Sequence, residues 1–177
     1  MLQSQKNTVF SIVYEHFFNK NANYSKRNRN FVLKLNKKNT MGTEIIINKG
    51  YGDLEFGMTV PQTESILGSK GAPEASETPL GEPLSIVAHE EAGLTLFFED
   101  EPFALKSIEI YDLDSTLFNE PVFDLGKKEI TEIMKKNGFP ESETAQEDWG
   151  ETSLSFPEAN IDFFFEGDEL ISILMAH

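Results

Sequence analysis

The feature that most constrains the fold is a partial internal repeat. A shift of 67 residues aligns residues 56–101 with residues 123–168 without a gap, and ten of the 46 aligned positions are identical. Composition alone gives roughly three identities over this length. The identical pairs are Phe56 and Phe123, Ile66 and Ile133, Gly71 and Gly138, Pro73 and Pro140, Glu74 and Glu141, Glu91 and Glu158, Ala92 and Ala159, Phe97 and Phe164, Phe98 and Phe165, and Glu99 and Glu166. We therefore predict that residues 41–177 form a duplicated α+β domain, with repeat one over about 50–115 and repeat two over about 117–177.

Each unit carries the signals of a short helix followed by antiparallel strands. Thr59 and Gln62 have the spacing of a capping box, and Gly68 is a typical helix end. In the second unit, the apolar residues of 130–134 fall on one helical stripe. Alternating apolar residues then predict a hairpin in each unit. The expected fold class is α+β: a tandem repeat of a short helix plus an antiparallel β-meander, with the helices on one face of a curved sheet.

Charge divides the chain near residue 40. Residues 1–40 hold eight Lys or Arg against one Glu, a net of +7, whereas residues 41–177 hold seven Lys against 29 acids, a net of −22. We predict that residues 1–40 are a disordered or non-native leader and that Met41 is the true start. A net charge of −22 produces a negative field that repels nucleic acid and anionic lipid but speeds encounter with a basic protein. The expected partner is therefore a basic protein, although acidity that serves only solubility is an equal reading.

The chain has no Cys, and no run of 18 apolar residues occurs in it. Disulfides and thiolate sites are excluded, and no membrane span is expected. Since no signal peptide, lipobox or transmembrane segment is recognised, the sequence predicts a cytoplasmic protein.

Strand parity suggests where a partner protein binds. If Leu94, Leu96 and Phe98 face the helix, then Phe97 faces away, and the repeat places Phe164 on the same side. Tyr111 shares that side, and Trp149 lies just before a predicted strand. We predict that Phe97, Phe164, Tyr111 and Trp149 form an aromatic partner-binding patch. The alternative readings are that the two phenylalanines fill a second core layer or are covered by residues 1–40.

Catalytic and cofactor signals are weak. His89 is the one histidine in the predicted folded part other than the last residue, and it reads as a surface or strand-end residue. Asp112, Asp114 and Glu120 approach the spacing of a calcium loop, but its required glycine and final glutamate are missing. We predict no enzyme activity, no cofactor and no metal site.

Several short motifs resemble a known repeat. In the first unit they are Phe56–Thr59, Leu67–Gly68, Pro73 and Gly93–Phe98, and in the second they are Phe123, Gly138, Pro140 and Asn160–Phe165. This pattern resembles the SmpA/OmlA (BamE-like) repeat module and is similar to the tandem repeat of the beta-lactamase inhibitor protein. The resemblance implies helices on one face of a curved sheet whose other face grips a partner protein.

Three functions follow as expectations. The first is a non-catalytic protein-binding module, of the immunity or inhibitor type, that blocks a basic partner. The second is a BamE-like module of envelope assembly, although the cysteine that anchors such proteins is missing here. The weak catalytic signals disfavour the third, a metal-dependent hydrolase.

Overall fold

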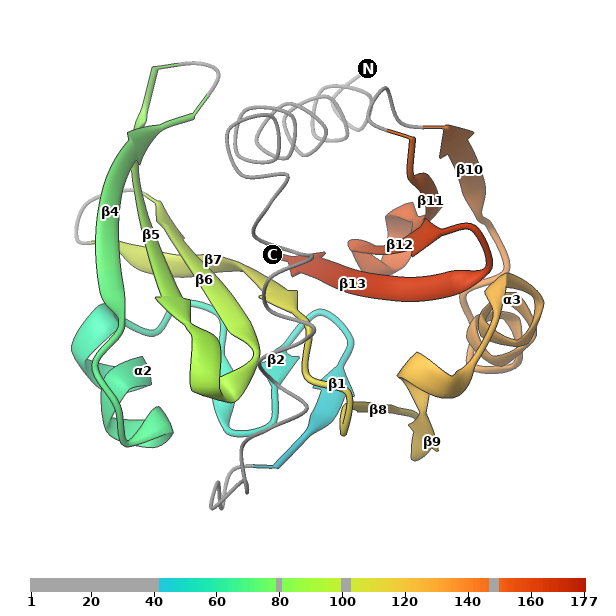
Figure 1. The fold of residues 1–177 in the computed structure, drawn as a ribbon, viewed down its shortest axis with the longest axis horizontal. Coiled ribbons are helices and arrows are strands. Elements are labelled where there is room, and N and C mark those ends of the chain that lie inside the picture. The colour runs from blue at the N-terminus through green and yellow to red at the C-terminus, as the bar shows by residue number, and fades with distance from the viewer. Residues whose placement is uncertain (1–41, 79–80, 100–102, 147–149) are drawn as a thin grey trace.

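A computed structural model describes residues 42–78, 81–99, 103–146 and 150–177. Within these ranges the chain forms a large sheet of eight strands and a small sheet of five strands (Figure 1). The large sheet consists of β4 (Ala72–Glu77), β5 (Pro83–His89), β6 (Leu94–Glu99), β7 (Ala104–Ile110), β10 (Glu143–Gln146), β11 (Thr152–Phe156), β12 (Ile161–Glu166) and β13 (Glu169–Ala176). The small sheet consists of β1 (Glu44–Ile46), β2 (Gly50–Tyr51), β3 (Leu54–Glu55), β8 (Thr116–Leu117) and β9 (Glu120–Pro121).

The large sheet is antiparallel throughout, in the order β10-β11-β12-β13-β7-β6-β5-β4. Its middle is the pairing of β7 with β13, in which Ile110 lies opposite Ile173 and Ser107 opposite Ala176 (Figure 1). Register shifts occur at Phe97/Phe98 in the β6–β7 pairing and at Phe164/Phe165 in the β12–β13 pairing. Strands that follow one another in the chain therefore pair within β4–β7 and within β10–β13, and the two runs meet at the β7–β13 pairing.

The predicted fold class is wrong. The described ranges are mostly strand, with two α-helices, α2 (Val60–Leu67) and α3 (Lys127–Lys136), and three short 3₁₀ turns, η1 (Glu90–Ala92), η2 (Val122–Asp124) and η3 (Pro157–Ala159). The small sheet breaks the expected plan, because strand β1 pairs in parallel with the distant strand β8. The chain is therefore not a repeat of a short helix plus a meander. Strands of two or three residues are too short to produce the alternation by which a strand is recognised in a sequence.

A capping box and a glycine mark the two ends of α2. Gln62 Oε1 accepts a hydrogen bond from the Thr59 N–H at 2.8 Å, and Gly68 ends α2 with a φ of 66° while its N–H reaches Glu64 O at 2.9 Å. In α3, Ile130 and Met134 are buried. The helices are thus short, and their stability depends on packing against the sheet more than on their own hydrogen bonds.

The main core lies on one face of the large sheet. It joins Leu96 and Phe163 of that sheet to Leu67 of α2, Met134 of α3 and Tyr51 of the small sheet. Gly93, after η1, takes a φ of 66°, and a Cβ there would lie 3.0 Å from the backbone N of Asp112. Glycine therefore allows the turn before β6 to touch the segment that leads into the small sheet.

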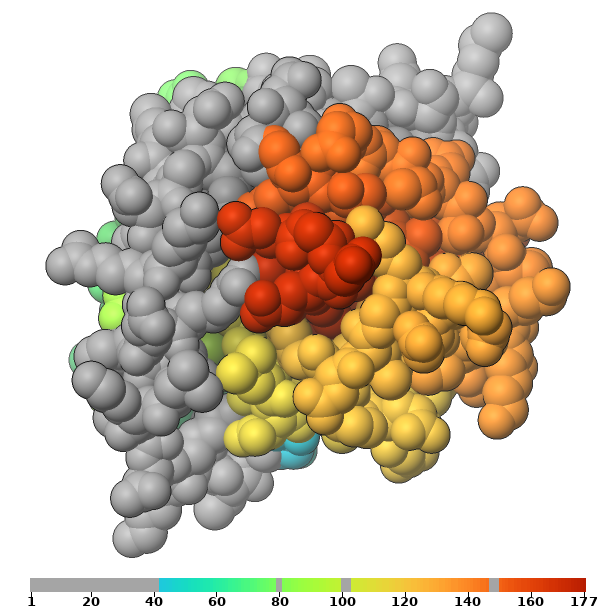
Figure 2. Space-filling view, turned by 45° about the vertical axis from the view of Figure 1, so that its right-hand side comes forward, coloured from blue at the N-terminus to red at the C-terminus, as the bar shows by residue number. Residues whose placement is uncertain are grey.

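Polar contacts at the surface tie neighbouring segments together. Lys127 Nζ lies 5.1 Å from the centroid of the Phe165 ring and donates to Gly167 O at 3.3 Å, which links α3 to the β12–β13 hairpin. Figure 2 shows the C-terminal segment (red) at the surface beside the segment that contains α3 (gold). The partly exposed cation–π contact is worth about 0.5–1 kcal/mol.

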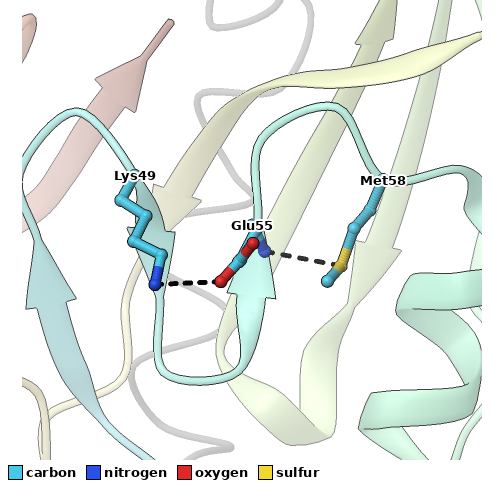
Figure 3. Close-up of polar contacts among 3 residues, drawn as sticks. All are labelled: Lys49, Glu55 and Met58. Carbon is cyan, nitrogen blue, oxygen red and sulfur yellow. Dashed lines mark hydrogen bonds and ion pairs between the residues drawn. The ribbon is translucent and has the colours of Figure 1, made fainter.

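A second surface contact closes the β2–β3 turn. Lys49 Nζ lies 3.0 Å from Glu55 Oε1, and the Glu55 N–H points to the Met58 sulfur at 3.4 Å (Figure 3). Both charged side chains are more than half exposed. An exposed pair of this kind contributes about 0–1 kcal/mol to stability, so it affects the local turn more than the stability of the whole fold.

Residues 1–40 and Trp149 lie outside the described residues, so the predicted leader and one member of the predicted aromatic patch stay predictions.

Candidate functional site

The large sheet has a second face, opposite the main core, with its own apolar cluster. Alternation along β6 sends Leu94, Leu96 and Phe98 into the main core and leaves Thr95 and Phe97 on the other side. The second cluster consists entirely of residues of β5, β6, β12 and β13. Its members are Leu84, Ile86, Phe97, Phe164, Ile171 and Leu174. We call this side of the sheet the second face.

The two predicted aromatic positions lie together in this cluster. Phe97 lies opposite Ile86 and Ser107, and Phe164 lies opposite Ser153 and Ser172. Each ring is 5% exposed, so neither stands open to solvent in the free chain. Alternation along the strands therefore puts both rings on the second face, where they are buried.

Polar side chains also lie on the second face. Five hydroxyl or carboxylate side chains on it are buried: Thr95, Ser107, Glu109, Ser153 and Ser172. Glu109 is 1% exposed, and its cross-strand neighbours are Thr95 on β6 and Leu174 on β13. Glu109 was not among the predicted site residues, although alternation along the strand puts it on the face opposite to that of Ile108 and Ile110.

Tyr111 lies beside this group of polar side chains. The side chain is half-buried and lies close enough to Glu109 for the charge of that carboxylate to act on it. Burial, together with the negative charge of Glu109, raises the pKa of Tyr111 well above its usual value. The phenol therefore stays protonated, and the partner contact that the sequence predicted for Tyr111 stays a prediction.

His89 is the last residue of β5, as the strand-end reading expected, but it is 4% exposed. Its Nδ1 lies 3.5 Å from Ser69 Oγ, and its Nε2 finds no hydrogen-bond partner among the described residues. A Cβ at Gly71 would lie 2.9 Å from that Nε2, so the ring fills the space beneath the start of β4. Burial lowers the pKa of His89, and the negative charge of Glu64 opposes the shift only in part.

Stability is expected to depend on pH through His89. Because the folded pKa lies below the ordinary 6.5, the unfolded chain binds more protons once the pH falls below that value. The contribution of His89 to stability is complete above about pH 6.5 and is lost as the pH falls toward the lowered pKa. Urea unfolding from about pH 7.5 to about pH 5.5 should show a weaker loss for His89→Phe and His89→Leu than for the parent chain. Equal slopes for all three chains would contradict this account.

Asp112, one of the acidic residues with calcium-loop spacing, makes contacts within the fold. Asp112 Oδ2 accepts from the Tyr51 hydroxyl at 2.9 Å, and Asp112 Oδ1 accepts from the Asp114 N–H at 3.2 Å. Ser115 Oγ lies 2.9 Å from the Tyr51 hydroxyl and donates to the Asp112 carbonyl. Across the ranges that the structure describes, no three His, Asp or Glu side chains gather in a way that would hold a metal ion.

None of the helices in the described ranges combines the length and the apolar character that crossing a bilayer requires. Comparison of the chain with protein-family models, with characterised protein sequences and with solved structures gives no match. The resemblance to BamE-like and inhibitor-type repeats therefore stays a prediction.

Proposed function

We propose that this chain is a non-catalytic protein-binding module of the immunity or inhibitor type, and that the second face docks a basic partner protein. The observation that carries the proposal is the second apolar cluster, which is built on the sheet face opposite the main core. The helices pack on the other face of the sheet, so the main core does not require this second apolar cluster. Aromatic side chains are enriched in the central, buried part of protein interfaces, and this cluster gathers two of them on one face.

Docking works by exchange, because the six apolar side chains of the second face are buried in the free chain. Removing water from one such side chain is worth about 1.5–3 kcal/mol, so uncovering the face is unfavourable unless a partner covers it again. A partner that presents complementary apolar groups restores this energy and replaces the groups that moved. Tight binding is therefore expected only for a partner that covers the whole second face.

Charge supports a basic partner. Four of the seven Lys of residues 41–177 lie in α3, which leaves three Lys for the rest of these residues, where 27 of the 29 acids lie. Outside α3 these residues therefore carry a net charge of 3 − 27 = −24. Such a field raises association rates and weakens with added salt.

Substitution of the two aromatic side chains tests the proposal. Phe97→Ala and Phe164→Ala are each expected to weaken partner binding by about 30-fold or more, as for central interface aromatics. Partners are trapped in the native cells by a photo-crosslinking residue at position 97, and the identified partner is then titrated against each variant. Thermal melting of the same samples shows whether the fold survives.

Three results would contradict the proposal: a trapped partner without a net positive charge, an affinity that stays constant from about 50 mM to about 500 mM salt, or variants that bind normally. Variants that simply fail to fold would assign the two rings to a second core layer. We further propose that the protein works in the cytoplasm, which cell fractionation tests.

A further inference from the structure

We propose that protonation of His89 opens the start of the edge strand β4 while the rest of the large sheet stays folded. The device lies within one molecule, so it goes beyond the proposed function and requires no partner protein. It makes one end of the large sheet sensitive to mild acid. The opened state leaves the backbone edge of β5 unpaired, and an edge of this kind can pair with another strand.

The ring of His89 lies at the end of β5 in a place that accepts only its neutral form. The residue is 4% exposed, and its Nε2 has no hydrogen-bond partner within the part of the chain that the structure describes. Gly71, just before β4, lies against this nitrogen, since a Cβ at Gly71 would be 2.9 Å from Nε2. Both nitrogens of a protonated ring are donors, so Nε2 then becomes a buried donor without an acceptor. The closed position of β4 therefore disfavours the protonated ring.

The groups around the ring compensate for a positive charge only in part. Glu64 of α2 is the charged group that acts on His89, and it opposes the lowering of the His89 pKa that burial causes. Ser69 Oγ lies 3.5 Å from Nδ1, and Leu94, opposite His89 on β6, is apolar. The nearest charged residues along the chain are exposed, and they are Lys70, Glu90 and Glu91.

Strand β4 is the element beside the ring that moves most easily. It is the last strand at one end of the large sheet, where it pairs with β5 (Figure 1). Five of its six residues are exposed, and Pro73 has no backbone N–H to donate. Lifting residues 71–73 therefore uncovers little apolar surface and breaks few hydrogen bonds, which are the properties of a segment that opens locally.

The other end of the sheet provides a natural comparison. All four residues of β10 are exposed, and β10 pairs with β11, whose last residue is Phe156. The repeat aligns Phe156 with His89, and a 3₁₀ turn follows each of them. Phe156 is 1% exposed and belongs to the main core. Because a phenyl ring does not titrate, mild acid is expected to open β4 and to leave β10 closed.

Hydrogen–deuterium exchange of the full chain tests the proposal, with mass spectrometry of peptides that cover β4 and β10. The ring takes up a proton near pH 6.5 when β4 is open and at lower pH when β4 is closed. Between about pH 7.5 and about pH 5.5, the opening constant of β4 should therefore rise about 3- to 10-fold relative to that of β10, after correction for intrinsic exchange. Equal changes in the two strands would overturn the proposal.

Two variants move the response in opposite directions. His89→Phe gives β5 the ring that ends β11 and is expected to abolish the difference between β4 and β10. Glu64→Gln removes the charge that favours the protonated ring, so the His89 pKa, measured by NMR titration, should fall further and the acid response of β4 should increase. Glu91→Gln, at an exposed residue of η1, is the matched control and should behave as the parent chain does.

Acid opening of β4 that persists in His89→Phe would overturn the proposal, because another group would then be the trigger. A smaller acid response in Glu64→Gln than in the parent chain would also overturn it. The Glu64→Gln comparison keeps the proposal testable even if the larger ring of His89→Phe prevents folding.

Discussion

Replacing Phe163 with alanine is expected to lower the free energy of unfolding by about 3–5 kcal/mol. The ring is fully buried in the main core and meets the Phe156 ring edge to face, with centroids 5.9 Å apart. Its cross-strand neighbours, Leu154 and Ile173, are buried in the same core. A truncated side chain therefore leaves a cavity that rigid strands on both sides do not close. Urea denaturation followed by tryptophan fluorescence or circular dichroism measures the loss.

Leu113→Ala is the control, since this side chain is 42% exposed and its loss is expected to change stability by less than about 0.5 kcal/mol. A Phe163→Ala chain that unfolds at the same urea concentration as the Leu113→Ala chain would mean that the main core does not lie where the structure places it.

Removal of the Asp112 carboxylate should be the next largest loss. Asp112→Ala is expected to lower the free energy of unfolding by about 3 kcal/mol. The buried hydroxyl of Tyr51 and the N–H of Asp114 then both lose the carboxylate that accepts their hydrogen bonds. Tyr51→Phe removes one donor from the same group and is expected to cost about 1–3 kcal/mol. Both side chains are buried where the small sheet meets the segment after β7, so the effect reaches both sheets.

The double variant separates the hydrogen bond from the packing around it. If the Tyr51–Asp112 contact carries the energy, the losses of the two single variants will add to more than the loss of the double variant, by about 0.5–3 kcal/mol. Asp114→Ala, at an exposed position, should cost little by comparison. Strictly additive losses would show that the two side chains stabilise the chain independently.

Local structure was readable from the sequence where a strong signal marks an element. Thr59 and Gly68 bounded α2, and the apolar stripe of Ile130 and Met134 identified α3. These signals are local, so they hold whatever the tertiary arrangement. The edge strands β4 and β10 gave no such signal, because both are almost entirely exposed and polar.

The small sheet was beyond the reach of the sequence for a different reason. Its key contact is the parallel pairing of Glu44 with Thr116, which brings together segments 72 residues apart through a few backbone hydrogen bonds. Neither segment shows the alternation of a longer strand. A fold class inferred from the repeated motifs therefore omitted an entire sheet.

The candidate site was predicted in part. Strand parity placed Phe97 and Phe164 on one face, since alternation is a property of the strand itself. The burial of these rings and the position of the Glu109 carboxylate depend on which strands pair with one another. Glu109 comes close to Leu174 only through the β7–β13 pairing, which no local pattern announces.

The β7–β13 pairing also bears on how copies of this chain can exchange parts. Each run of four strands forms most of its hydrogen bonds with itself, while the contact that unites them joins Ile110 to Ile173, 63 positions further along. If the two runs separate, β7 and β13 each expose an unpaired backbone edge of matching register. Two molecules opened in this way can close on one another, so crowded refolding favours domain-swapped dimers in which each run completes the sheet of the other molecule.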